Sequence, residues 1–470
     1  MNIWKISYSY NAIRYAIIVP IILSIIFPKY FIPIGLYTVG SFIIVSFFIA
    51  FPYYEKKWKG ISIKSFEKKI FRVSFFLRLV FVIYLYSISY FLAPNSFPFE
   101  YGAADSWTYH IVALELKDYP LNQIFEKLPD LMKGRADFGF PTFLALIYKI
   151  SGGTTFLVRI VNILLSTFTV ILLSRLARFL FTEKHARLTG IIAMLFPSLI
   201  WFSAIQLKET LMIFMIVSVF YYVLKTYINK KITLKPIFFI IVFSLFLFYF
   251  RTFLAVLVII SFMLFLTLNN DNSKKATRNT VSVILISIGL VFVFNSTNLF
   301  SDVDAQLSER EGFMENNLSD AQDRLGNISY TNALVSPLII VGAFITPFPS
   351  FLQTEERQFP IIFHYQNEMV KNLMYYFGLL GIIIAIRKNF KKTIMLSFFV
   401  LSYLFVLMTT ANSFIDRFQL VNVPFVIIFM SVGLIDSDLK WKKRWNHYLV
   451  LLVVMHVSWT LFKLNIRGLI

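Results

Sequence analysis

Apolar runs of about twenty residues recur along this chain, and they constrain its fold more than any other feature. The hydrocarbon core of a bilayer is roughly 30 Å thick, so an α-helix needs ~20 apolar residues to cross it. The mean hydropathy of +0.71 and the charged fraction of 15% agree with a membrane protein, because soluble domains carry about 25% charged residues. A soluble enzyme is therefore excluded.

About thirteen runs are long and apolar enough to be predicted as spans. They lie at 12–28, 31–52, 71–93, 156–174, 188–204, 209–227, 236–250, 252–268, 280–296, 372–386, 393–411, 419–435 and 447–462. The sequence thus predicts an all-α fold, a polytopic bundle of about thirteen transmembrane helices.

The absence of cysteine and the scarcity of histidine exclude several kinds of chemistry. With no Cys and five His in the chain, there is no thiolate nucleophile, no disulfide framework and no Cys-ligated zinc. The histidines show no metal-ligand spacing, so no protein-held metal is expected. The sequence also lacks a glycine-rich phosphate loop, which argues against ATP hydrolysis.

The net charge of +20, from 45 Lys and Arg against 25 Asp and Glu, belongs to one side of the membrane. Basic residues gather in the short loops on alternate sides of the predicted spans, and the positive-inside rule makes these loops cytoplasmic. Examples are Lys56, Lys57, Lys59, Arg175, Arg178, Lys184, Arg187, Lys230, Lys231, Lys274, Lys275, Arg387, Lys388, Lys442 and Lys443. This topology puts the N-terminus inside and the C-terminus outside. It assigns the charge to contact with anionic lipid, so no nucleic-acid partner is expected.

Two long polar loops, 94–138 and 297–335, then fall on the opposite, extracytoplasmic face, and both are net acidic. The apolar pieces 139–150 and 334–346 are too short, or too broken by proline, to be spans. We expect both to be juxtamembrane or re-entrant helices on that face.

The spans and loops divide the chain into four predicted parts. These are an N-terminal hairpin with its basic loop (1–70), a transmembrane core that includes the outer loop 94–155 (71–296), a second outer loop (297–371) and the C-terminal helices (372–470).

The segment 103–113 reads as a helix on the extracytoplasmic face. Asp105 and Tyr109 are four residues apart and Trp107 and His110 are three apart, so the helix would present two polar and aromatic faces. Asp105 is a candidate catalytic carboxylate. The alternative is that it only caps the helix.

Charged residues at the outer membrane edge are further candidates, because charge is costly there. Lys208 and Glu209 lie in an almost loopless hairpin, as a structural ion pair or as substrate contacts. Arg251 interrupts the apolar run 236–268. Its guanidinium suits a phosphate, although snorkelling to the interface would also explain it. The pair of Asp416 and Arg417 is either functional or a plain surface ion pair.

The order of these features resembles the polytopic GT-C glycosyltransferases, the superfamily of protein mannosyltransferase-like and aminoarabinose-transferase-like enzymes. The resemblance rests on DSWTYHIVALEL from Asp105, on FGFPTFLALIYKISGG, on Arg159-Ile160-Val161-Asn162 and on FPSLIWFSAIQLKET. It is specific over about 71–230 and architectural beyond.

The resemblance implies an inverting transferase that takes a sugar from a polyprenyl-phosphate-linked donor to a glycan, lipid or protein acceptor. Asp105 matches the position of the base. Lys208, Glu209, Arg251, His110, Tyr109 and Arg417 would bind substrate or the donor phosphate. The second acid that many of these families carry beside the Asp is replaced by Ala103 and Ala104. We therefore favour a mechanism without a divalent metal or other cofactor.

Two rival readings stay open. A polymerase or ligase of polysaccharide repeat units would use similar lipid-linked donors. A transporter of lipid-linked glycans would need charges near mid-span, whereas these spans are nearly free of them. The Ile-, Phe-, Lys- and Asn-rich composition favours a bacterial inner membrane and a role in building the cell envelope.

Overall fold

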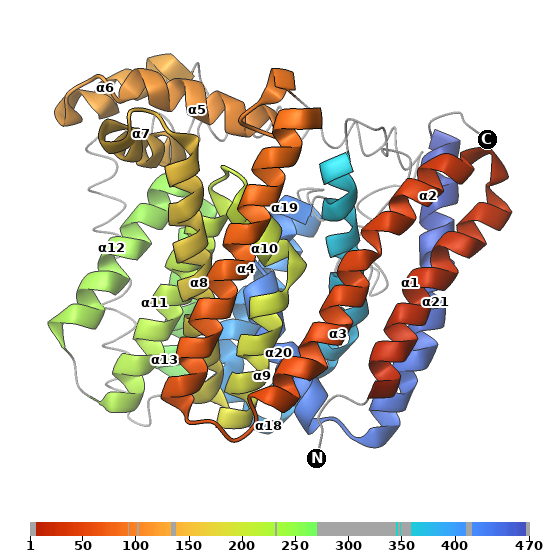
Figure 1. Ribbon diagram of the computed structural model, residues 1–470. Helices are drawn as coiled ribbons and strands as arrows, with labels where there is room; N and C mark the ends of the chain where they lie inside the picture. The colour runs from red at the N-terminus through yellow and green to blue at the C-terminus, as the bar shows by residue number, and fades with distance from the viewer. Residues whose placement is uncertain are drawn as a thin grey trace.

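The structure, a computed structural model, describes residues 6–92, 94–100, 103–132, 138–230, 233–269, 345, 348, 359–409 and 416–466. Throughout this part of the chain every regular element is helical. Figure 1 shows a bundle of long helices with a layer of short helices, α5 to α7, across one end.

The elements follow one another as α1 (Ile6–Ile26), η1 (Pro28–Tyr30), α2 (Phe31–Gly40), α3 (Phe42–Lys57), α4 (Ile63–Leu92), η2 (Pro94–Ser96), α5 (Ala104–Leu116), α6 (Leu121–Met132), α7 (Gly139–Ser151), α8 (Thr155–Leu180), α9 (Glu183–Leu195), α10 (Pro197–Ala204), α11 (Glu209–Asn229), α12 (Leu234–Phe250), α13 (Thr252–Leu268), α18 (Phe359–Thr409), α19 (Asp416–Gln419), α20 (Val423–Asp436) and α21 (Leu439–Ile466).

Among the described residues, seven helices are long and apolar enough to cross a membrane, or eight if the bent pair α9 and α10 is one span. The helical membrane fold is as predicted, but the count of thirteen spans is not confirmed. The predicted spans 236–250, 252–268 and 419–435 coincide with the shorter apolar helices α12, α13 and α20. The predicted span 280–296 lies outside the described residues.

Helix α18 is a hairpin rather than a rod. Its backbone leaves the helical region at Asn389 (φ −150°, ψ 57°). Lys371 contacts Gln419, and Tyr403 donates to the carbonyl of Phe418, so residues on both arms reach the same short helix, α19. A straight helix of 51 residues would be about 75 Å long, far more than a bilayer is thick. The two arms correspond to the predicted spans 372–386 and 393–411.

Glycines let α18 and α20 approach closely. A Cβ on Gly381 would lie 1.8 Å from the carbonyl oxygen of Phe429, and one on Gly433 would lie 2.0 Å from that of Phe377. Backbone contact of this kind is typical of helix packing in membranes, where dispersion and close fit replace the hydrophobic effect.

The bundle has two chemically different ends. The connections α3–α4, α8–α9, α11–α12 and α20–α21, and the bend of α18, gather at the end opposite α5 to α7 (Figure 1). They carry the described basic residues predicted to be cytoplasmic, and we call this the basic end. The end that carries α5 to α7 is called the cap end. Helix α7 confirms that 139–150 is a short helix at the cap end, while 334–346 lies, Ile345 excepted, outside the described residues.

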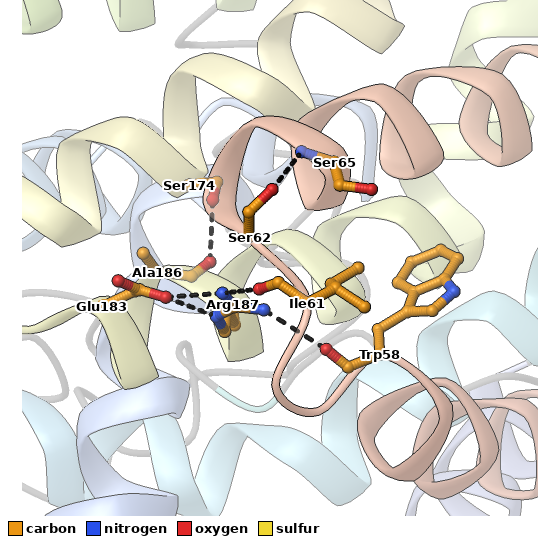
Figure 2. A network of polar contacts seen from close by, with 8 residues as sticks. All are labelled: Trp58, Ile61, Ser62, Ser65, Ser174, Glu183, Ala186 and Arg187. Carbon is orange, nitrogen blue, oxygen red and sulfur yellow. Dashed lines mark hydrogen bonds and ion pairs between the residues drawn. The ribbon is translucent and has the colours of Figure 1, made fainter.

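Arg187 closes the connection between α3 and α4 at the basic end (Figure 2). Its guanidinium donates to the carbonyl oxygens of Trp58 at 3.2 Å and Ile61 at 2.5 Å, and it pairs with Glu183 one turn earlier on α9. The network fixes the loop that follows the N-terminal hairpin to the core. The four-part division of the chain stays a prediction.

Arg78 corrects the prediction that the spans are nearly free of mid-membrane charge. It lies within α4, is fully buried, and donates to the hydroxyls of Ser74 at 2.6 Å and Ser166 at 2.8 Å. It also donates to the carbonyls of Ala193 and Met194, at the break between α9 and α10. Pro197 has no N–H to offer the Ala193 carbonyl, and the extended backbone at Phe196 ends the helix for Met194 as well. Arg78 therefore satisfies acceptors that the broken helix exposes.

Candidate active site

Three charged residues from distant parts of the chain meet at the cap end. Asp105 lies in the first turn of α5, Glu209 in the first turn of α11, and Arg417 in α19. Nη1 of Arg417 contacts Oδ2 of Asp105, and Nε of Arg417 lies 3.2 Å from Oε1 of Glu209. The Asp105 side chain is 42% exposed, whereas that of Glu209 is 1% exposed. One carboxylate of this Asp105–Arg417–Glu209 triad is thus open to a ligand, and the other is closed off.

The position of Asp105 argues against the alternative that it only caps its helix. The residue before α5 is Ala103, and no side chain caps this helix. The predicted helix over 103–113 is present, and Asp105 reaches across to α19. Its nearest upstream acid, Glu100, is buried beside Arg159 instead. The second carboxylate that contacts Arg417, together with Asp105, is that of Glu209.

The surroundings of Arg417 stabilise its positive charge. Its burial by itself lowers the pKa of the guanidinium, but Glu209 and Asp105 outweigh this effect and raise the pKa well above its usual value. Arg417 therefore remains a cation at any physiological pH. A fixed cation can stabilise negative charge that develops on a leaving group, and a half-exposed carboxylate beside it can accept a proton.

A second guanidinium stands close to the triad. Arg251 is an extended residue between α12 and α13, where the chain reverses. Its Cζ lies 4.6 Å from the centre of the Phe418 ring, and Cζ of Arg417 lies 5.2 Å from that centre. Two arginines thus share one aromatic ring, which orients both guanidinium groups through cation–π contacts.

Side chains of α18 hold the short helix α19 in place. Lys371 is fully buried, with its Nζ 2.9 Å from Oε1 of Gln419 and 3.8 Å from Oδ1 of Asp416. The Tyr403 hydroxyl donates to the Phe418 carbonyl at 2.7 Å. The interpretation of Asp416 and Arg417 as a surface pair is wrong, because Asp416 is 5% exposed and points to Lys371. Neighbouring helical residues project about 100° apart, so Asp416 holds the turn while Arg417 reaches the triad.

The remaining predicted site residues divide between two places. Tyr109 is buried one turn after Asp105, packs edge-on to Phe140 and lies within the electrostatic reach of Arg417. Lys208 is a buried side chain directly before α11. His110 is on the other face of α5, with Trp107, as the predicted two-faced helix requires.

That other face belongs to a second polar cluster, formed by Glu100, His110, Tyr148, Arg159 and Gln206. The Tyr148 hydroxyl lies 2.8 Å from Nδ1 of His110 and accepts a hydrogen bond from Nε2 of Gln206 at 2.9 Å. Arg159 is fully buried and donates to the carbonyl of Pro98 at 2.5 Å. The cluster ties the segment before α5, α5 itself, α7, α8 and the segment before α11 together.

Burial sets the protonation of this second cluster. It raises the pKa of Glu100, against the opposing effect of Arg159, and it lowers the pKa of His110. Burial also raises the pKa of Tyr148 to about 12. His110 is therefore neutral near pH 7, and Tyr148 keeps its proton.

In the part of the chain that the structure describes, no three His, Asp or Glu side chains are grouped as metal ligands. The mechanism without a metal stays a prediction. Sequence reasoning missed Tyr148, because a tyrosine in a short apolar helix carries no signal of its role. It also missed Arg78, although a lone arginine inside a predicted span is such a signal.

Residues 138–298 match the family model described as dolichyl-phosphate-mannose-protein mannosyltransferase. The resemblance to GT-C membrane glycosyltransferases is confirmed. The match spans α7 to α13 and includes Lys208, Glu209 and Arg251. It begins after Asp105 and extends past residue 230, beyond the range over which the sequence motifs are specific. No curated protein matches the chain.

Proposed function

We propose that this GT-C-type membrane glycosyltransferase moves a sugar from a polyprenyl-phosphate-linked donor to an acceptor hydroxyl at the cap end, with Asp105 as the base. The observation that carries the proposal is the Asp105–Arg417–Glu209 triad beside Arg251. It joins a half-exposed carboxylate to two guanidinium groups at one end of the bundle.

The reaction is a single displacement. Asp105 accepts the proton of the acceptor hydroxyl, while the oxygen of that hydroxyl forms a bond to the anomeric carbon. The bond from that carbon to the phosphate oxygen breaks, and the electron pair leaves with the lipid phosphate. Arg417 and Arg251 stabilise the charge that develops on the phosphate, and Lys208, which directly precedes Glu209, adds a third cation. One displacement inverts the anomeric configuration, and no step requires a metal.

An apolar cavity of about 450 Å³ supports a lipid-linked donor. It lies between α3 and α4 and reaches the break between α9 and α10, where Leu195 and Pro197 line it. Phe42 and Val80 at its lining are 69% and 63% exposed on spans that would face lipid. From Pro197, the short helix α10 leads to the segment that carries Glu209, so this cavity and the triad are joined by one short stretch of chain.

The proposed topology puts the basic end in the cytoplasm, by the positive-inside rule, and the cap end outside. A bacterial inner membrane and a role in cell-envelope polysaccharide synthesis complete the proposal. The family match favours transfer of a single sugar over a repeat-unit polymerase or ligase, which would use the same cations. The acceptor is a glycan, lipid or protein.

The test measures transfer of labelled sugar from synthetic polyprenyl-phosphate donors by purified protein. We expect Asp105→Asn to lose turnover on the order of 10²-fold to 10⁴-fold while donor binding is retained. Glu67→Gln is the matched control, since this carboxylate pairs with Arg175 at the basic end at 2.7 Å, and its turnover should equal that of wild type.

Unchanged turnover in Asp105→Asn would remove Asp105 from the reaction. Turnover by wild type with polyprenyl-diphosphate oligosaccharides alone would identify a polymerase or ligase. Uptake of a lipid-linked glycan into vesicles without any transfer would identify a transporter.

A further inference from the structure

Tyr148 connects the two elements that carry the carboxylates of the triad. His110, its first partner, lies on α5 five residues after Asp105. Gln206, its second partner, lies three residues before Glu209. Tyr148 belongs to neither element, since it projects from α7 and is fully buried. One phenolic hydroxyl thus joins the supports of both carboxylates.

One arrangement of protons makes use of every donor in these two hydrogen bonds. An amide nitrogen can only donate, so the Tyr148 oxygen accepts from Gln206, and its own proton can be donated to Nδ1 of His110. Nδ1 must then be the unprotonated nitrogen of a neutral imidazole. The lowered pKa of His110 agrees with the neutral imidazole that this arrangement requires. Both contacts of Tyr148 are therefore satisfied at once.

The position of α5 depends on such a contact. This helix lies across the end of the bundle, outside the packed spans, and it rests on α7 (Figure 1). The approach is close at the turn after α7, where a Cβ on Gly153 would lie 2.5 Å from Leu114 of α5. Two polar contacts then join the helices: Lys149 of α7 donates to the carbonyl of Lys117 at the end of α5 at 2.6 Å, and Tyr148 contacts His110 in its middle. The contact at His110 is the one that lies next to the Asp105 face.

We propose that Tyr148 is a positioning residue for the transfer reaction. Its hydroxyl holds α5 and the segment before α11 in the register at which Asp105 and Glu209 share Arg417. The kinetic consequence rests on the proposed function, whereas the geometric consequence does not.

The kinetic test is Tyr148→Phe, which removes one oxygen and keeps the ring. We expect kcat to fall by about 10-fold to 100-fold, with KM for the lipid donor changed less than about twofold, because a misplaced base affects the transition state more than donor binding. The matched control is Tyr376→Phe, which removes a hydroxyl that donates to the Trp441 carbonyl at 2.6 Å between α18 and α21. Its kcat should equal that of wild type.

The geometric test uses the absence of native cysteine. Cysteines placed at the exposed positions Glu115 on α5 and Asn229 at the end of α11 carry the only two spin labels, and double electron–electron resonance measures the distance between them. We expect a distribution that is broader or shifted in Tyr148→Phe and unchanged in Tyr376→Phe.

A kcat for Tyr148→Phe equal to that of wild type would overturn the inference, and so would an unchanged distance distribution. Loss of activity that is matched by Tyr376→Phe would reduce Tyr148 to a general stabilising residue. If the wild-type protein transferred no sugar, the proposed function would fail, and the distance measurement would still decide whether Tyr148 positions α5.

Discussion

The two ends of the bundle use arginine in opposite ways. At the basic end, Arg187 pairs with Glu183 one turn away and spends its other donors on two backbone carbonyls of the adjoining loop. At the cap end, Arg417 is shared by two carboxylates that lie on α5 and α11, and one of them is half exposed. The arrangement at the basic end fixes a loop, and the donors of Arg187 are used in doing so. The arrangement at the cap end keeps a carboxylate and a cation available to a ligand.

Removing the arginine at the cap end should have the largest effect on activity. Arg417→Ala should lower kcat/KM by about 10²-fold to 10³-fold, because a group that stabilises developing charge is lost. Arg187→Ala should leave kcat/KM within about twofold of wild type and lower the melting temperature instead. Steady-state kinetics and thermal unfolding of both variants in detergent provide the measurement. Equal kinetic effects at the two ends would refute the contrast.

The buried lysine at the cap end should matter more for stability than its exposed counterpart. Lys371→Met leaves Asp416 buried without this cation and should cost about 3 kcal/mol of unfolding free energy. Lys388 pairs with Asp436 at 3.5 Å at the basic end and is 58% exposed, so Lys388→Met should cost less than about 1 kcal/mol. Thermal unfolding checks both values. The double variant Lys371→Met, Asp416→Leu should recover most of the loss, and failure to recover would locate the cost elsewhere.

A substitution in the apolar cavity should affect binding of the donor rather than the chemical step. Ala50 lines the cavity, and Ala50→Phe should raise KM for a long-chain donor on the order of tenfold, as expected when two methylene groups lose their contacts. KM for a short-chain donor should not change. Ile49 is exposed on the same helix and is not part of the lining, so Ile49→Phe is the control. Equal KM effects on both chain lengths would exclude the cavity as a chain site.

The smallest expected effect concerns pH. Burial lowers the pKa of His110 below its usual 6.5, so the unfolded chain binds the proton more readily than the folded protein does. The stability from neutral His110 is thus fully present above pH about 6.5 and is lost as the pH falls below it. The melting temperature should fall by a few degrees more in wild type than in His110→Gln between pH about 7.5 and about 5.5. Parallel curves would contradict this expectation.

Local features of the sequence predicted most of the fold. A run such as 156–174 predicts a helix wherever it lies, because length and hydrophobicity act locally. Helix α8 contains this run, beginning one residue before it and ending six residues after it, at Leu180. The helix that begins at Ala104 was likewise readable from the spacing of Asp105 and Tyr109. The predicted spans 372–386 and 393–411 leave a short loop between them, and the structure shows a helical hairpin that bends at Asn389.

The partners within the site were not predictable from spacing. Asp105 was predicted as a candidate on its own, and nothing in its neighbourhood names Arg417, which lies 312 residues further along the chain. Asp416 and Arg417 look like a pair because they are adjacent, yet they face different elements. Tyr148 gains its role only through the packing of α7 against α5. Such contacts arise from the tertiary arrangement, which the spacing of residues along a single sequence does not reveal.

The separation of Arg417 from its two carboxylates also has a consequence for biosynthesis. Asp105 and Glu209 leave the ribosome long before the arginine that joins them, and α19 can dock only after both arms of α18 have been inserted. During most of its synthesis the chain thus lacks the shared cation. A protein that ends before residue 416 would contain the carboxylates in a membrane but no complete triad, so the proposed site is completed late in assembly.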